Sequence, residues 1–314
     1  MKPVLLTRGR PAWNLFANKP GSRKRILGMR CKAQNCTHNP GETMSGDIAF
    51  VGGGNMANAI INGMIEQGYP RERISVVEPL AEARDKLKSH FGLIAQQAPG
   101  QFLEACDIVV WAVKPQTFKD AARQTRFYTR AALHLSVAAG IPSDSIARWL
   151  ASERVVRAMP NTPALIGKGI TALFARPGVT EDDQHMVGQI MRTTGEFLWV
   201  DAEDKLDAVT ALSGSGPAYV YYFMEAMTAA GAEMGLTRDQ AYQLTVATFI
   251  GAAELAKSSN EPPEILRQRV TSKGGTTHAA ITAMDESEIK PRFMRALHAA
   301  RLRAQELGRE FGGD

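Results

Sequence analysis

The stretch that decides the fold is VGGGNMA, residues 51–57. It follows a short apolar run and opens a segment whose apolar residues have helical spacing. Between a strand and a helix, a GxGxxA pattern is the fingerprint of a dinucleotide-binding turn: Gly52 permits the tight turn, Gly54 lets the backbone approach a pyrophosphate, and Ala57 keeps the helix close to the strand. Free N–H groups at the helix start then face the phosphates. A glycine turn without a ligand is the alternative, and this context makes it the weaker one.

Apolar runs rich in β-branched residues alternate with helical segments around this turn. Such alternation is typical of βαβ units with a parallel sheet. We therefore predict an α/β fold whose N-terminal part, residues 44–202, is a Rossmann-type doubly wound sheet that binds a dinucleotide. Its expected strands are 48–51, 74–78, 108–113, 132–137, 155–159, 170–175 and 197–200, and its first helices are 57–67 and 80–89.

From residue 203 onward the strand signals stop and the apolar spacing becomes helical. We predict an all-helical dimerisation domain over residues 203–314, with helices at 206–212, 218–234, 238–256, 263–270 and 290–310. These helices offer more apolar surface than one small bundle can bury, which favours a homodimer or a higher homo-oligomer built from dimers. The longest apolar stretch, 218–234, carries Glu225 and Glu233 and is too short for a membrane span.

Residues 1–43 differ from the rest in composition. They hold nine Lys or Arg against one acid, Glu42, for a net charge of +8, so residues 44–314 carry −3 of the whole chain's +5. No apolar period runs through them, and Met44 leads into the first strand. We expect a disordered, functionless extension upstream of the true start. An Arg-rich transit peptide is the alternative, but such peptides are rich in serine and only Ser22 precedes residue 44.

Charge and cysteine usage limit the classes of function. Residues 44–314 are mildly acidic, so they lack the basic surface that binding to nucleic acid requires. Two cysteines, Cys31 and Cys36, lie in the basic extension and Cys106 is alone in the body, which leaves no disulfide framework and no metal-ligand set. We expect a cytoplasmic protein that acts on a small molecule, with no metal and no nucleic-acid or membrane partner.

Two charged residues follow expected strands of the dinucleotide domain. Glu78 lies 24 residues after Gly54, where an acid accepts hydrogen bonds from the adenosine ribose and repels a 2′-phosphate. This favours NADH, although Arg84 could still reach a phosphate; a solvated turn residue before Pro79 is the alternative. Lys114 closes the third strand and is a candidate phosphate or nicotinamide contact, or a surface lysine at a strand end.

Two polar turns interrupt the helical region. They are ALSGSGPAY at 211–219 and VTSKGGTTHA at 270–279. The second gathers hydroxyls and backbone amides at a helix start, where a substrate carboxylate can bind as a phosphate does. Ordinary helix caps are the alternative for both turns, since Ser and Thr favour caps.

Together these segments resemble pyrroline-5-carboxylate reductase along almost all of residues 47–300. The matching pieces are VGGGNMA at 51–57, AVKPQ at 112–116, SVAAGI at 136–141, RAMPNTPA at 157–164, ALSGSGPAY at 211–219 and TSKGGTTHAAI at 271–281. The last two are the marks specific to this family. The resemblance implies hydride transfer from NADPH or NADH to the C=N bond of 1-pyrroline-5-carboxylate, the last step of proline biosynthesis.

The resemblance also implies site residues. The cofactor-binding set is Gly52, Gly54, Asn55, Met56, Ala57, Glu78, Ala112, Val113, Lys114, Pro115, Ala139 and Gly140. The substrate-binding set is Ser272, Gly275, Thr276, Thr277 and Glu203. Thr277 is the expected catalytic residue, because its hydroxyl lies close to the substrate ring nitrogen in the family. Lys273, where the family often has proline, and Glu78, where an NADPH user often has a small polar residue, depart from the pattern.

Two other functions are open to a chain of this layout. A β-hydroxyacid dehydrogenase would need a lysine after the GSG turn to take the alcohol proton, and no lysine occurs between Lys205 and Lys257. A non-catalytic dinucleotide sensor would need no hydroxyl-rich turn like the one at 271–277. Imine reduction needs no charged general acid, because positioning and polarisation supply most of the catalysis.

Overall fold

The computed structural model describes residues 46–313, so the extension expected at residues 1–43 lies outside the described residues. Seven strands form one sheet in the order β2-β1-β3-β4-β5-β6-β7. All seven predicted strands are confirmed, with small shifts of their ends. They are β1 Ile48–Val51, β2 Ile74–Val77, β3 Ile108–Trp111, β4 Leu133–Ser136, β5 Val155–Met159, β6 Gly169–Ala175 and β7 Gly195–Trp199.

One strand pair departs from the expected parallel sheet. β5 and β6 are antiparallel, with Arg157 opposite Phe174, whereas the other neighbours in the sheet are parallel. The segment that joins them, residues 160–168, holds only a short 3-10 turn, Thr162–Ile166. A parallel crossover needs about a dozen residues or more, so this short link can only reverse the chain.

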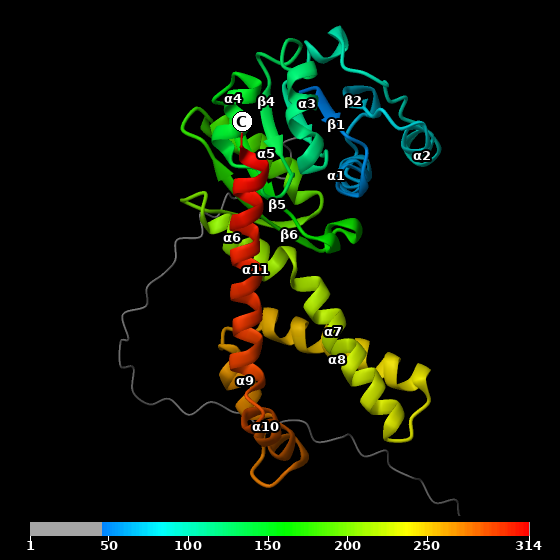
Figure 1. The fold of residues 1–314 in the computed structure, drawn as a ribbon. Helices are drawn as coiled ribbons and strands as arrows, with labels where there is room; N and C mark the ends of the chain where they lie inside the picture. The colour runs from blue at the N-terminus through cyan, green and yellow to red at the C-terminus, as the bar shows by residue number, and fades with distance from the viewer. Residues whose placement is uncertain (1–45, 314) are drawn as a thin grey trace, which may run out of the picture. The chain divides into compact units, whose positions relative to one another are not determined.

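Alternate residues of the strands supply the two halves of the core. Ile48 and Phe50 belong to one buried cluster, and Ala49 and Val51 belong to the other. The first cluster packs under α1, α2 and α5, and the second under α3 and α4, which are spread over the two faces of the sheet (Figure 1). These helices are α1 Asn55–Glu66, α2 Ala81–Phe91, α3 Pro115–Thr125, α4 Ser143–Leu150 and α5 Glu181–Arg192.

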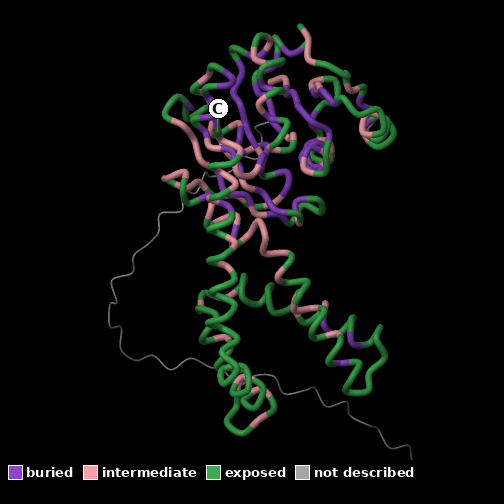
Figure 2. The backbone as a smooth tube through the Cα atoms, in the orientation of Figure 1, coloured by how far each residue is buried: buried purple, intermediate pink, exposed green. Residues whose placement is uncertain are grey.

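Beyond β7 the chain is helical. α6 continues into a π-helical turn, Thr210–Gly214, at the expected break before α7. The helices are α6 Lys205–Val209, α7 Gly216–Glu233, α8 Arg238–Ser258, α9 Pro263–Arg269, α10 Thr276–Glu286 and α11 Ile289–Gly312. Figure 2 shows that α7 to α10 are mostly exposed along their length, in contrast to the buried strands.

The final helix leads back to the sheet. Phe311 packs against the second core cluster, and the Ser145 hydroxyl donates a 2.7 Å hydrogen bond to the Gly312 carbonyl. The opposite end of α11 adjoins α10 (Figure 1). α11 therefore connects the helical region to the Rossmann part. Within residues 46–313, no helix combines the length and apolar character that crossing a membrane requires.

Candidate active site

The glycine turn after β1 lies against the end of β3. Gly52 has a φ of +97°, a backbone conformation that favours glycine, and its N–H donates a 2.8 Å hydrogen bond to the Val77 carbonyl. A side-chain carbon at Gly52 would come within 2.7 Å of the Ala112 carbonyl oxygen. The turn therefore requires glycine at this position, and it brings the ends of β1, β2 and β3 together.

The start of α1 is open. Gly54 is its N-cap and has no side chain to accept the free N–H groups of the first turn. A side-chain carbon built on Gly54 would meet nothing within 4 Å, so the space in front of these N–H groups is clear. Asn55 and Gly54 are exposed and Ala57 is buried against the sheet. Open N–H groups, a positive helix end and empty space fit the pyrophosphate of a dinucleotide.

Glu78 is part of the same turn. Its carboxylate accepts hydrogen bonds from the Gly53 N–H at 2.7 Å and the Leu80 N–H at 2.8 Å, and the residue is 6% exposed. The alternative that Glu78 is a solvated turn residue is therefore wrong. Arg84 donates to the Glu78 and Pro79 carbonyls at 3.0 and 2.7 Å, which holds its guanidinium at the carboxyl end of β2.

Met56 lies in the first turn of α1, and the other expected cofactor residues lie at the ends of β3 and β4, which are adjacent strands. Ala112, Val113 and Pro115 are partly buried, and Lys114 is exposed at the N-cap of α3. Ala139 and Gly140 are partly buried in the loop that follows β4. The structure thus brings the expected cofactor residues to one edge of the sheet, where doubly wound folds bind ligands.

The expected substrate turn also has an open helix start. Gly275 is the N-cap of α10, without a side-chain cap, and its N–H donates to the Ser272 carbonyl at 3.0 Å. Thr276 and Thr277 form the first turn of α10, with Thr277 partly buried. Free N–H groups beside the hydroxyls of this turn can bind a carboxylate.

Within one chain, this turn and the cofactor residues are far apart. α10 runs into the amino end of α11, whereas Gly140 lies against Leu307 near the carboxyl end of α11. α11 has 24 residues and is therefore about 36 Å long. Figure 1 shows α10 at the end of α11 that points away from the sheet. Thr277 consequently does not reach the cofactor edge of its own chain.

Glu203 does not lie with the other expected substrate residues. Its carboxylate accepts hydrogen bonds from the Ser143 N–H and the Ser143 hydroxyl, both at 2.6 Å, and from Arg157 at 2.6 Å. These partners belong to α4 and β5 of the Rossmann part. The contacts of Glu203 are therefore structural contacts at the junction with α6.

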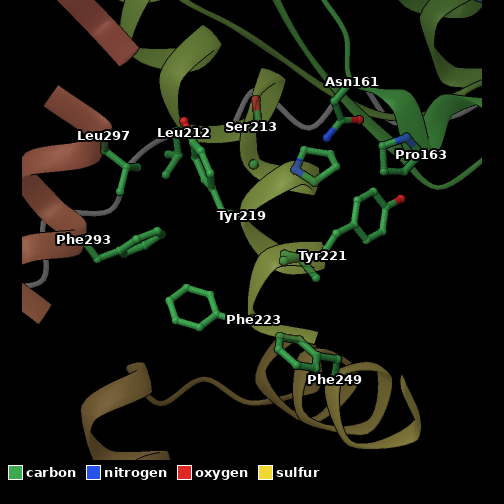
Figure 3. Close-up of a pocket in the computed structure, with 13 residues that line it drawn as sticks. Asn161, Pro163, Leu212, Ser213, Tyr219, Tyr221, Phe223, Phe249, Phe293 and Leu297 are labelled. Atoms are coloured by element: carbon green, nitrogen blue, oxygen red, sulfur yellow. The ribbon is translucent and has the colours of Figure 1, made fainter. Parts of the chain in front are cut away.

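A pocket of about 520 Å³ lies between α7, α11 and the residues that follow β5 (Figure 3). Its walls are mainly aromatic and aliphatic, and Tyr219 and Phe223 each contact Phe293 edge to face. No lining residue of this pocket, which the described part of the chain forms, is charged. The lining residues are Asn161, Pro163, Leu212, Ser213, Gly216, Pro217, Tyr219, Val220, Tyr221, Phe223, Phe249, Phe293 and Leu297.

The segments RAMPNTPA and ALSGSGPAY match the family pattern, but the sequence alone assigns no role to their side chains. The structure brings Asn161 of the first segment and Ser213 of the second to the same pocket. Asn161 Oδ1 accepts a 3.0 Å hydrogen bond from the Ile170 N–H, which fixes the turn that follows β5. The feature of the sequence that could have pointed to this pocket is the polar turn at 213–217, which lies between two apolar helices.

The glycine turn at the carboxyl edge of the sheet, with its open helix start, defines a dinucleotide-binding protein of the Rossmann class. The chain is 42% identical over 267 residues to the pyrroline-5-carboxylate reductase of Pseudomonas aeruginosa, an alignment that covers 84% of this chain and 98% of that one. The chain belongs to the pyrroline-5-carboxylate reductase family.

Other comparisons agree with this assignment. Residues 203–307 match the family described as pyrroline-5-carboxylate reductase dimerisation, and residues 47–140 match NADP oxidoreductase coenzyme F420-dependent. The Coxiella burnetii pyrroline-5-carboxylate reductase superposes with a TM-score of 0.78 at 40% identity, covering 83% of this chain and 98% of that chain. The Plasmodium falciparum pyrroline carboxylate reductase with NADP bound has a TM-score of 0.76 at 28% identity, covering 85% of this chain and all of that one.

Proposed function

We propose that this chain reduces the C=N bond of 1-pyrroline-5-carboxylate to give L-proline, using NADH or NADPH. The observation that carries the proposal is the presence of two open helix starts, one suited to a pyrophosphate at Gly54 and one lined by hydroxyls at Thr277, in a chain 42% identical to a pyrroline-5-carboxylate reductase. When bound, the reduced nicotinamide supplies the hydride.

The residues of this chain contribute mainly binding and orientation. The free N–H groups of α10 bind the substrate carboxylate, because they carry the positive end of the helix dipole. The Thr277 hydroxyl then faces the ring nitrogen, whose basicity rises as the C=N bond is reduced. Holding the ring in this way converts a bimolecular encounter into an oriented one.

We further propose that a second copy of the chain completes each site. The pocket between α7 and α11 has no charged lining residue, so it offers a carboxylate no cation. Thr277 lies at the far end of α11 from the Gly140 loop of its own chain. An α10 start supplied by the partner subunit of a dimer brings both parts of the site together.

Adding 1-pyrroline-5-carboxylate to the protein with NADH or NADPH tests the reaction. We expect the absorbance of the reduced cofactor to fall and proline to accumulate in equal amount. The Gly54→Asp variant is the control: Gly54 has room for a side chain, but a carboxylate there repels the phosphates. If the parent protein oxidises neither NADH nor NADPH, the reductase activity is refuted. If it binds the cofactor but does not turn it over, the dinucleotide sensor is favoured.

Mixing two impaired variants tests the shared site. Gly54→Asp damages the cofactor part of the site, and Thr277→Ala damages the substrate part. If each site combines the cofactor edge of one chain with the α10 start of its partner, a mixed dimer has one site in which both parts are intact. We expect recovery to roughly a quarter of the parent activity after subunit exchange, since half of randomly paired dimers are mixed and each has one intact site. No recovery, with mixed dimers demonstrated by differential tagging, would place the whole site within one chain.

We also propose a cytoplasmic location. Cys106 is a buried free thiol, and burial raises its pKa to about 11, so it is a poor nucleophile for disulfide exchange. A free cysteine of this kind is common in a reducing compartment. Fractionation of cells that express the full chain would test the location, and recovery of the protein in the medium or with membranes would contradict it.

A further inference from the structure

The loop at residues 137–142 joins β4 to α4 and carries Ala139 and Gly140, which we assign to the nicotinamide side of the cofactor. A loop of this kind needs external contacts to hold one conformation. Gly140 has a φ of +73°, and Ile141 is fully buried, so the loop is anchored at its centre. The contacts at its two sides come from the helical region.

α11 covers one side of this loop. A side-chain carbon at Gly140 would lie 3.2 Å from Cβ of Leu307, and one at Gly312 would lie 2.7 Å from Pro142. The Ser145 hydroxyl donates to the Gly312 carbonyl at 2.7 Å. The last turns of α11 thus lie in direct contact with the loop.

Glu203 holds the end of the loop where α4 begins. Its two oxygens accept hydrogen bonds from the N–H and hydroxyl of Ser143, the first residue of α4, and Arg157 donates to the same carboxylate. The side chains of Arg157 and Glu203 are 12% and 26% exposed, so water screens this ion pair only in part. A carboxylate at a helix start is also favoured by the helix dipole.

We propose that Glu203 is a positioning residue for the nicotinamide half of the cofactor. Acting through Ser143, it fixes loop 137–142 between α6 and α11 and so sets where Ala139 and Gly140 lie. Glu203 touches neither the cofactor nor the substrate in this role. The proposal rests on the cofactor placement in the proposed function, and it changes the role of Glu203 from a substrate ligand to a support of the cofactor site.

Comparing two ligands separates this role from general stability. NADH occupies the whole cofactor site, whereas ADP-ribose has the adenosine, pyrophosphate and second ribose of NADH and lacks only the nicotinamide ring. For Glu203→Gln and Ser143→Ala we expect the Kd of NADH to rise roughly fivefold to tenfold, where tenfold corresponds to about 1.4 kcal/mol. The Kd of ADP-ribose should stay unchanged, because Gly52, Gly54 and Glu78 lie on other elements.

Three further variants complete the test. Ser143→Thr keeps the hydroxyl and should bind NADH as the parent does. Asp201→Asn is the matched control, because Asp201 pairs with Lys205 in the same segment and does not contact the loop. The double variant Glu203→Gln, Ser143→Ala should bind NADH almost as well as the single variant with the lower affinity. The reason is that both changes act on the same contact, between Glu203 and Ser143.

Binding is measured without substrate, so these outcomes do not depend on which imine the enzyme reduces. An equal loss of affinity for NADH and ADP-ribose, or unchanged NADH binding in both single variants, would overturn the positioning role. Failure of the chain to reduce 1-pyrroline-5-carboxylate, with the two-ligand difference intact, would refute the proposed substrate and leave the positioning role supported.

Discussion

The carboxylate of Glu78 accepts a hydrogen bond of 2.7 Å from the backbone N–H of Gly53. This bond joins the end of β2 to the glycine turn, so the carboxylate helps to shape the turn that we expect to face the adenosine ribose. A second hydrogen bond, from the Leu80 N–H, holds the carboxylate in this orientation. We therefore expect cofactor choice and turn geometry to depend on the same side chain.

Replacing Glu78 with serine should shift the enzyme toward NADPH. A fixed carboxylate repels a 2′-phosphate and loses its ribose hydrogen bonds when that phosphate is present. We expect the ratio of kcat/KM for NADPH to that for NADH to rise by roughly tenfold, equivalent to about 1.4 kcal/mol. Glu82→Ser, at an exposed position in the first turn of α2, is the control. An unchanged ratio would show that Glu78 only supports the turn.

Removing the hydroxyl of Thr277 should slow turnover. Loss of one neutral hydrogen bond costs about 0.5–1.5 kcal/mol, and more where the bond strengthens in the transition state. We expect kcat for Thr277→Ala to fall by roughly tenfold or more, with Thr277→Ser keeping much of the activity. The Kd of the cofactor should not change.

Thr282→Ala provides the control for this helix. Thr282 donates only to the His278 carbonyl of α10, so its loss should leave turnover intact. If both Thr277 variants have the kcat of the parent at saturating cofactor, Thr277 only forms the start of α10 and has no role in turnover.

A buried histidine should make the protein sensitive to acid. Burial lowers the pKa of His134 to about 3, and the nearby Arg154 guanidinium contributes to the same shift. Between this value and the ordinary 6.5, the unfolded chain binds a proton that the folded chain does not. Above about pH 6.5, protonation of His134 does not lower the free energy of unfolding. As the pH falls from 6.5 toward 3, the free energy of unfolding decreases, because the unfolded chain takes up a proton that the folded chain does not.

Urea unfolding at about pH 7.5 and pH 5 measures this effect. His134→Gln keeps an acceptor for the Trp111 Nε1–H, which bonds to His134 at 3.2 Å, and it should reduce the drop in midpoint between the two pH values. His90→Gln, at an exposed position on α2, should leave the drop as it is. The same pH dependence in the His134 variant and the parent would assign the acid sensitivity to other groups.

Deleting residues 1–43 should leave kcat and Tm unchanged. That segment has no apolar period with which to pack, and its +8 charge contrasts with the −3 of residues 44–314. Thermal unfolding and steady-state assays of the chain starting at Met44 check this. A Tm lower by several degrees would show that the segment contributes to the folded structure.

The sequence predicted the strands well because each is a short apolar run between turn residues. The antiparallel direction of β6 was not predicted, although the gap between the expected strands 155–159 and 170–175 is too short for a parallel crossover. The helices α3, α4 and α5 were not predicted as elements, although α5 has a capping box at Thr180 and Asp183 that is visible in the sequence.

The candidate site was predicted less completely than the fold. Motifs indicate which residues carry chemistry, but the spacing between motifs does not give their separation in space. The long α11 keeps Thr277 away from Gly140, and no local pattern encodes that distance. The family resemblance placed Glu203 in the substrate site, whereas its partners Ser143 and Arg157 are distant in sequence and could only be found in the fold.

The exposed helices beyond the sheet have a consequence for how stability is measured. In α7 only Gly231 is buried, in α8 only Ala241 and Thr245, and in α9 and α10 no residue is. Helices with so little internal packing are held mainly by association with another chain. Their melting should therefore follow mass action: diluting the protein lowers the temperature at which α7 to α10 unfold, whereas the buried strands of the sheet lose their structure at a temperature that depends much less on concentration.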